Sequence, residues 1–153
     1  MLFLKDVVEN KGGHRLFYAD GKPIRREADL HILFRLTWRN TPSDVNREVN
    51  NGRGPSDFEI SRGRFDKSLV EFKLASSSSL RRNLEIQAEI YQKASDAQHA
   101  LKVIVFFTED ELNKVRAVLR ELVLEGNPNV ILIDARDDNK PSASKATAGG
   151  MHE

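Results

Sequence analysis

A run of apolar residues from Val103 to Phe107 restricts the fold of this 153-residue chain more than any other feature. Together with Lys102, it forms a segment with no alternation of polar and apolar positions. A short, continuous apolar run of this kind is typical of a strand that is buried on both faces of a sheet. We therefore expect an α/β fold in which helices cover both sides of a central sheet.

The residues that follow this strand continue the α/β pattern. Thr108 is placed to cap a helix, Glu111 to complete its capping box, and Gly126 to end it. Val130–Ile133 predicts one more short strand. From Asp137 the composition changes to Asp, Asn, Lys, Ser, Ala and Gly, which is typical of a polar tail.

The first part of the chain gives a weaker pattern. Gly12-Gly13 and Asp20-Gly21 are turn signals within residues 1–22, and they predict two short strands or a hairpin. Apolar residues then recur at helical spacing, which predicts a helix over Arg26–Trp38 that ends before Pro42.

The middle of the chain predicts three adjacent strands joined by short turns. An Asn/Gly-rich turn at 50–55 separates two short alternating segments, the second of which is Asp57–Ile60. After a second turn around 62–64, Leu69–Leu74 alternates again, and a helix is expected over Leu80–Ala97. The predicted order is therefore helix, three-strand meander, helix, strand, helix, strand.

Length and composition indicate one soluble domain. We expect a single domain over residues 1–136, with its core at about 26–107, a strand–helix–strand unit at 102–134, and a flexible polar tail at 137–153. The chain has no cysteine, which excludes disulfides and thiolate metal sites. No apolar run is long enough to cross a bilayer and no secretory signal pattern is present, so we expect a cytoplasmic protein without a membrane partner.

Two of the predicted strands carry acidic and basic residues that share a face. Strand periodicity places Glu71 and Lys73 on the same face, and Asp57 lies on the preceding strand. If these strands are hairpin neighbours, Asp57 lies close to Glu71. Two carboxylates brought together repel each other unless a cation lies between them, and oxygen ligands suit Mg²⁺ or Mn²⁺.

A lysine beside such a metal site can orient water or neutralise charge on a phosphate. The arrangement therefore predicts a site that hydrolyses phosphodiester bonds. The alternative is that Glu71 and Lys73 form an ordinary solvated strand face, for which a Glu-x-Lys pair is also typical.

Three segments together resemble the PD-(D/E)XK nuclease superfamily, which has the restriction-endonuclease-like fold. They are Gly52–Asp57, Leu69–Lys73 and Gln87–Tyr91, and the Gln-x-x-x-Tyr helix is similar to one branch that includes recombination-associated nucleases. The resemblance covers about Arg26–Phe107 and implies a mixed central sheet flanked by helices. The sequence departs from the family pattern where Ser56 separates Pro55 from Asp57.

The resemblance implies a role for each matching residue. Asp57 and Glu71 correspond to metal ligands, the backbone carbonyl of Phe72 to a further ligand, and Lys73 to the catalytic lysine. Gln87 and Tyr91 are one helical turn apart, so both can face the cleft or the DNA backbone, with Gln87 assisting catalysis and Tyr91 contacting nucleic acid.

Many of these nucleases also carry a glutamate on the first helix. Glu27 is the best match because it shares a helical stripe with interior residues, and we expect it to be a further metal ligand. A solvated glutamate at a helix N-terminus explains the same position equally well. Glu48 from the first strand is a rival for this role, and Asp29 is a weaker one.

Basic residues fall in turns and helix starts around the expected site. Arg53, Arg81 and Arg82 are candidates for binding nucleic-acid phosphates, since arginine can hold a phosphate through two parallel hydrogen bonds. Ordinary surface arginines are the alternative, and a net charge of +1 gives no support for nucleic-acid binding from bulk charge. The four histidines show no zinc-ligand spacing.

These observations lead us to expect a Mg²⁺- or Mn²⁺-dependent nuclease acting on DNA, in restriction, anti-phage defence or repair. We expect a homodimer, or a missing N-terminal domain, to supply target specificity. The alternatives are a catalytically inactive nucleic-acid-binding or structural module of the same fold, and an RNA-cleaving, toxin-type nuclease.

Overall fold

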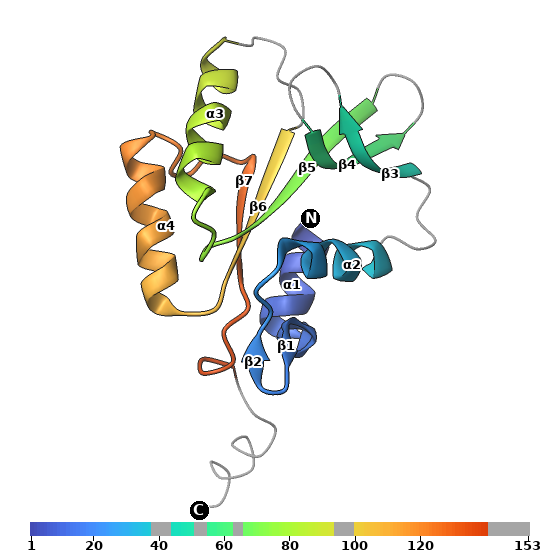
Figure 1. Cartoon of the computed structure of the whole chain (residues 1–153), viewed down its shortest axis with the longest axis vertical. Helices are drawn as coiled ribbons and strands as arrows, with labels where there is room; N and C mark the ends of the chain where they lie inside the picture. Colours follow the sequence, from blue (N-terminus) through green and yellow to red (C-terminus); the bar gives the residue numbers. More distant parts are fainter. Residues whose placement is uncertain (38–43, 51–54, 63–65, 94–99, 141–153) are drawn as a thin grey trace, which may run out of the picture.

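The computed structural model describes residues 1–37, 44–50, 55–62, 66–93 and 100–140 (Figure 1). In chain order the elements are α1 (Leu2–Asn10), the 3₁₀ helix η1 (Gly13–Phe17), β1 (Tyr18–Ala19), β2 (Lys22–Pro23), α2 (Glu27–Thr37), β3 (Asp44–Asn50), β4 (Pro55–Arg62), β5 (Asp66–Leu74), α3 (Leu80–Lys93), β6 (Ala100–Phe106), α4 (Glu109–Glu121) and β7 (Val130–Asp134). Within these ranges no helix has the length and apolar character needed to span a bilayer.

The central sheet is mixed, in the order β3-β4-β5-β6-β7. Strands β3, β4 and β5 are antiparallel neighbours, as the predicted meander requires. Strands β5, β6 and β7 are parallel, and α3 and α4 connect them. The prediction of an α/β fold with a mixed central sheet flanked by helices is confirmed.

Each face of the sheet has its own hydrophobic core. Helices α1 and α2 cover one face, where Val103 and Val105 of β6 are buried. Helices α3 and α4 cover the other, where Ile104 and Phe106 are buried (Figure 1). Successive residues of a strand point to opposite faces, so a strand covered on both sides needs apolar residues throughout. The predicted double burial of this strand is confirmed.

The prediction of strands near the N-terminus is wrong for residues 2–10, which form α1. Leu4 and Val8 are spaced four residues apart, and Val8 is fully buried against the sheet. This spacing suits a helix face better than a strand. The predicted turn at Asp20-Gly21 does join two short strands, β1 and β2, and both turn residues have positive φ, as a two-residue type I′ turn requires.

Helix α1 is attached to the last strand by polar contacts at β7. Lys5 Nζ donates to the Leu132 carbonyl at 2.6 Å, and Glu9 Oε1 accepts from the Asp134 amide at 2.9 Å. The Tyr18 hydroxyl donates to the Ala135 carbonyl at 3.0 Å. The beginning of the chain is therefore part of the same folded unit as β7.

Helix α4 begins as predicted but ends earlier. Thr108 Oγ1 accepts from the Glu111 amide at 3.1 Å, which confirms the predicted cap. The prediction that Gly126 ends the helix is wrong, because the helix stops at Glu121. Val123 there has φ 56° and is 87% exposed, while the Leu124 amide donates to the Leu119 carbonyl at 2.8 Å. This is the pattern of a helix C-terminus that glycine usually closes.

The other predicted boundaries agree within the described residues. Helix α2 confirms the prediction up to Thr37, and α3 confirms it up to Lys93, whereas Trp38 and the stretch 94–97 lie outside the described residues. Asn139, in the stretch expected to be a polar tail, donates to Asp134 at 2.9 Å.

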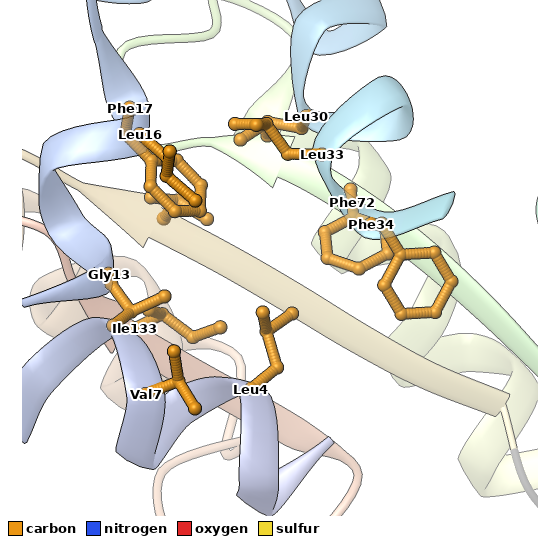
Figure 2. Close-up of a pocket in the computed structure, with 12 residues that line it drawn as sticks. Leu4, Val7, Gly13, Leu16, Phe17, Leu30, Leu33, Phe34, Phe72 and Ile133 are labelled. Atoms are coloured by element: carbon orange, nitrogen blue, oxygen red, sulfur yellow. The ribbon is translucent and has the colours of Figure 1, made fainter. Parts of the chain in front are cut away.

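A small cavity lies between α1, η1, α2 and the sheet (Figure 2). Its volume is about 40 Å³ and the atoms that line it are almost all carbon. The lining residues include Leu4 and Val7 of α1, Leu33 of α2, and Val105 of β6. This space beneath the N-terminal helices has no polar partners that could hold ordered water.

Replacing Val123 with glycine should stabilise the protein. A β-branched residue at positive φ costs about 1–2 kcal/mol, and glycine removes that cost. Since Val123 is exposed, little packing is lost, and we expect a gain of about 1 kcal/mol in the free energy of unfolding, measured by urea denaturation. Val123→Ala keeps a Cβ and should gain less; an equal gain would show that φ is not the cause.

Filling the cavity should also stabilise the fold. Val105→Ile adds one methyl group on the wall of the cavity and keeps a β-branched strand residue, so we expect a gain of about 0.5–1 kcal/mol. Val103→Ile is the matched control, because Val103 is buried on the same face of β6 but does not line the cavity. The control should be neutral or destabilising through overpacking. Thermal denaturation followed by circular dichroism tests both variants.

Candidate functional site

The sheet divides in two at the positions of Asp57 and Glu71. Pairing between β4 and β5 ends at Phe58–Val70, although β4 begins three residues earlier and β5 continues to Leu74. Before that point β4 stays paired with β3, and beyond it β5 stays paired with β6. We call this divergence of β4 from β5 the fork.

At the fork, a side chain accepts a hydrogen bond that the backbone of the neighbouring strand would otherwise accept. The Phe72 amide donates to Asp57 Oδ2 at 2.6 Å, in place of a carbonyl of β4. A buried amide without an acceptor is costly, so this bond compensates for the broken ladder and holds the Asp57 carboxylate between the strands. Asp57 therefore lies next to the segment that carries Glu71 and Lys73.

Three phenylalanines position α2 over the fork. Phe34 of α2 packs between Phe58 of β4 and Phe72 of β5, with ring centroids 4.7 Å and 4.6 Å away. Tilted aromatic pairs contribute about 0.5–1.5 kcal/mol beyond the area that they bury. Because all three rings are buried, they fix where α2 lies relative to the two strands.

Two polar residues of α2 reach the strand residues. Glu27 and His31 are one helical turn apart. Glu27 Oε2 accepts from Lys73 Nζ at 2.9 Å. His31 Nε2 lies 3.1 Å from Asp57 Oδ2, but the two atoms are not aligned for a hydrogen bond. The His31 ring also packs edge-on against Phe58, at 5.5 Å between centroids.

Glu71 lies between two lysines. Lys73 Nζ is 3.4 Å from Glu71 Oε1, and Lys102 Nζ of β6 donates to Glu71 Oε2. Together these contacts join residues from α2, β4, β5 and β6 into one group, which we call the fork cluster: Glu27, His31, Asp57, Glu71, Lys73 and Lys102.

Burial and charge change the protonation equilibria of the fork cluster. Burial raises the pKa of Asp57, although the Phe72 amide, His31 and Lys73 oppose the shift. Burial alone would lower the pKa of Lys73, but its hydrogen bond to Glu27 and the nearby carboxylates raise the pKa above its ordinary value. Burial lowers the pKa of Lys102 despite its contact with Glu71. The loss of hydration is therefore poorly compensated for the Asp57 carboxylate. For the Lys73 ammonium it is well compensated by the neighbouring carboxylates.

The chemistry of the fork cluster fits a hard divalent cation. It offers three carboxylates, and Glu27 Oε1 is buried without a hydrogen-bond partner. With histidine counted as neutral, three carboxylates against two lysines leave one negative charge for a cation to neutralise. As the side chains lie, no three carboxylate or imidazole groups among the described residues are close enough to hold a metal. A bound ion would therefore have to draw Glu27 or Glu71 away from its lysine.

The remaining predicted site residues are elsewhere or outside the described residues. Gln87 and Tyr91 lie in α3, and Glu48 in β3, but their side chains lie outside the described residues, as does Arg53. Phe72, whose carbonyl was expected to be a metal ligand, joins the site through its amide.

The arginines at the start of α3 are not directed to the fork cluster by any contact in the described part of the chain. Arg81 pairs with Glu85 at 3.0 Å and with Glu121 of α4 at 2.6 Å. Arg82 is exposed in the same turn. Asp29, the weaker rival of Glu27, pairs with Arg26 at 3.2 Å.

Sequence reasoning missed two members of the fork cluster, Lys102 and His31. Lys102 is the single charged residue at the start of the apolar run in β6, and a buried charge requires a partner. His31 follows Glu27 by four residues, so the two share a helix face. Both signals were present in the sequence, but neither indicates which distant residue is the partner.

The chain belongs to the family described as "Domain of unknown function (DUF8371)", which matches residues 1–109. This range contains every member of the fork cluster. Comparisons with curated proteins and with solved structures gave no match.

Replacing Asp57 with asparagine should stabilise the fold at neutral pH. The folded state raises the pKa of Asp57 above 3.8, so the ionised form lowers stability above the folded-state pKa, and this penalty disappears as the pH falls below 3.8. Asparagine has no charge and its carbonyl can still accept from the Phe72 amide. We expect a higher urea midpoint than the parent at pH 7, and a difference that shrinks toward pH 4.

Asp57→Ala is the matched control for this prediction. It also removes the charge but leaves the Phe72 amide without its acceptor, which costs about 1–3 kcal/mol. Asp57→Ala should therefore be less stable than Asp57→Asn at every pH. Equal stability of the two variants would contradict the role assigned to the Phe72 bond.

Proposed function

We propose that this member of the DUF8371 family is a metal-dependent nuclease that hydrolyses phosphodiester bonds in DNA, with Mg²⁺ or Mn²⁺ as cofactor. In this proposal Asp57, Glu71 and Glu27 hold the metal ion and Lys73 assists the reaction. The core is proposed to be restriction-endonuclease-like, and a homodimer is the proposed source of target specificity. The biological setting is proposed to be restriction, anti-phage defence or repair.

The observation that carries the proposal is the convergence at the fork. Asp57 from β4, Glu71 and Lys73 from β5 and Glu27 from α2 belong to one electrostatic group, although they are far apart in the sequence. A solvated strand face would leave Glu71 and Lys73 without such partners. The side chain of Lys73 is only 13% exposed, and a lysine is seldom buried to this degree without charged partners.

The residues of the fork cluster have distinct parts in the proposed reaction. A bound Mg²⁺ would lower the pKa of a coordinated water and polarise a phosphoryl oxygen. Lys73, held protonated by its carboxylate neighbours, can donate to a phosphate oxygen on which negative charge develops. Before a metal ion binds, Glu27 holds Lys73 through the 2.9 Å bond, so the ammonium is oriented in advance.

The topology supports the finer fold assignment. From α2 to β6 the order is helix, three antiparallel strands, helix and a parallel strand, which is the order implied by the resemblance to PD-(D/E)XK nucleases. In this arrangement the acidic residues are expected on the second and third strands, at the positions that Asp57 and Glu71 occupy.

A plasmid-cutting assay tests the proposed function. The full chain should cut DNA with Mg²⁺ or Mn²⁺, and EDTA should abolish cutting. Lys73→Ala and Asp57→Ala should each lower the rate about 10²- to 10⁴-fold, since each removes a group that acts on the reacting phosphate or holds the metal. Lys114→Ala is the matched control, because Lys114 is an exposed lysine of α4.

Each other result of this assay has a definite meaning. If cutting survives both Lys73→Ala and Asp57→Ala, the assigned site is wrong. If RNA is cut and DNA is not, the substrate assignment is wrong and the toxin-type alternative holds. If no nucleic acid is cut with either metal, a binding or structural module replaces the nuclease. Circular dichroism spectra must first show that the variants are folded.

A further inference from the structure

Lys102 is an unusual residue for the middle of a sheet. Its side chain is 2% exposed, and the residues that follow it in β6 all belong to the two hydrophobic cores. Placing an ammonium group in such surroundings is costly unless a negative group compensates for the lost hydration. A structural role alone would be served better by an apolar residue of similar volume.

The partner of Lys102 is set by the register of the sheet. Lys102 is paired with Glu71 across the parallel strands β6 and β5, and paired residues present their side chains to the same face. Lys102 Nζ donates directly to Glu71 Oε2. The ammonium is therefore held on one side of the Glu71 carboxylate by the sheet itself.

The two lysines around Glu71 differ in their carboxylate partners and in their burial. Lys73 is bonded to Glu27 at 2.9 Å and lies at 3.4 Å from Glu71, so it is shared between two carboxylates. Lys102 is bonded to Glu71 alone among the carboxylates of the described residues and is more deeply buried than Lys73. Lys102 is thus committed to Glu71, whereas Lys73 is divided between Glu71 and Glu27.

We propose that Lys102 is a fixed cation that takes the place of a second metal ion, so that each chain binds one divalent cation. This inference rests on the proposed function, because it concerns the same carboxylates. Lys102 occupies Glu71 Oε2, so this oxygen is not free to bind a second metal ion. The one remaining negative charge of the fork cluster is sufficient for a single divalent cation but not for two.

Whether a substitution of Lys102 raises or lowers metal affinity distinguishes a substitute cation from a residue that only orients Glu71. A unit charge about 5 Å from a divalent ion, at an effective dielectric constant of about 20, changes its affinity by well over tenfold. Loss of a contact that orients a metal ligand lowers affinity by about 10- to 100-fold. Removing the Lys102 ammonium should therefore strengthen metal binding if it acts as a cation, and weaken metal binding if it only orients Glu71.

Calorimetric titration of the full chain with Mn²⁺ tests the proposal. The parent protein should bind one Mn²⁺ per chain. Lys102→Met, which keeps the volume and removes the charge, should bind a second Mn²⁺ or bind the first at least tenfold more tightly. Lys102→Arg keeps the charge and should resemble the parent, as should Lys114→Met on the exposed face of α4.

The outcomes distinguish this inference from the proposed function. Two Mn²⁺ ions per parent chain, or unchanged or weaker binding by Lys102→Met, would overturn the role of Lys102 and leave the nuclease intact. Absence of Mn²⁺ binding by the parent would overturn both. If Lys102→Met does not fold, Lys102→Gln gives the same readout, because its amide can still donate to Glu71 without carrying a charge.

Discussion

The bond between the Phe72 amide and the Asp57 carboxylate is the interaction on which the candidate site depends. Two neighbouring strands of a sheet can diverge only if other groups satisfy the backbone that they leave unpaired. Here a carboxylate does so, and the same carboxylate then belongs to the charged group at the fork. The break in the sheet and the charged group therefore share one residue, Asp57.

Apolar and charged residues alternate in the strands at the fork, and α2 contacts both kinds. On one face, Phe34, Phe58 and Phe72 form an aromatic contact that fixes α2. The residues that alternate with them in β4 and β5 are the charged ones, Asp57, Glu71 and Lys73. Rigid apolar packing thus supports an arrangement of charges that would repel or reorganise in water. Such support by packing is what holds a polar site in a defined geometry.

Local patterns allowed much of this arrangement to be predicted. Alternation in Leu69–Leu74 and the short turn before it indicated that Asp57 and Glu71 belong to neighbouring strands, and the apolar run of β6 indicated burial on both faces. Lys102 and His31 could not be assigned in this way, because their partners depend on strand register and helix placement. Helix α1 was missed because two glycine-containing turns favoured strands, although Leu4 and Val8 have helical spacing.

The attachment of α1 to β7 also affects how the chain reaches its native state. Lys5 and Leu132 are 127 positions apart, yet they form one hydrogen bond. Since synthesis proceeds from the N-terminus, α1 leaves the ribosome well before the strand on which it docks. The apolar face of α1 therefore stays unburied until β7 has been synthesised. Contacts of such long sequence separation also slow folding. The nascent chain is thus expected to close its first hydrophobic core only when translation has passed β7.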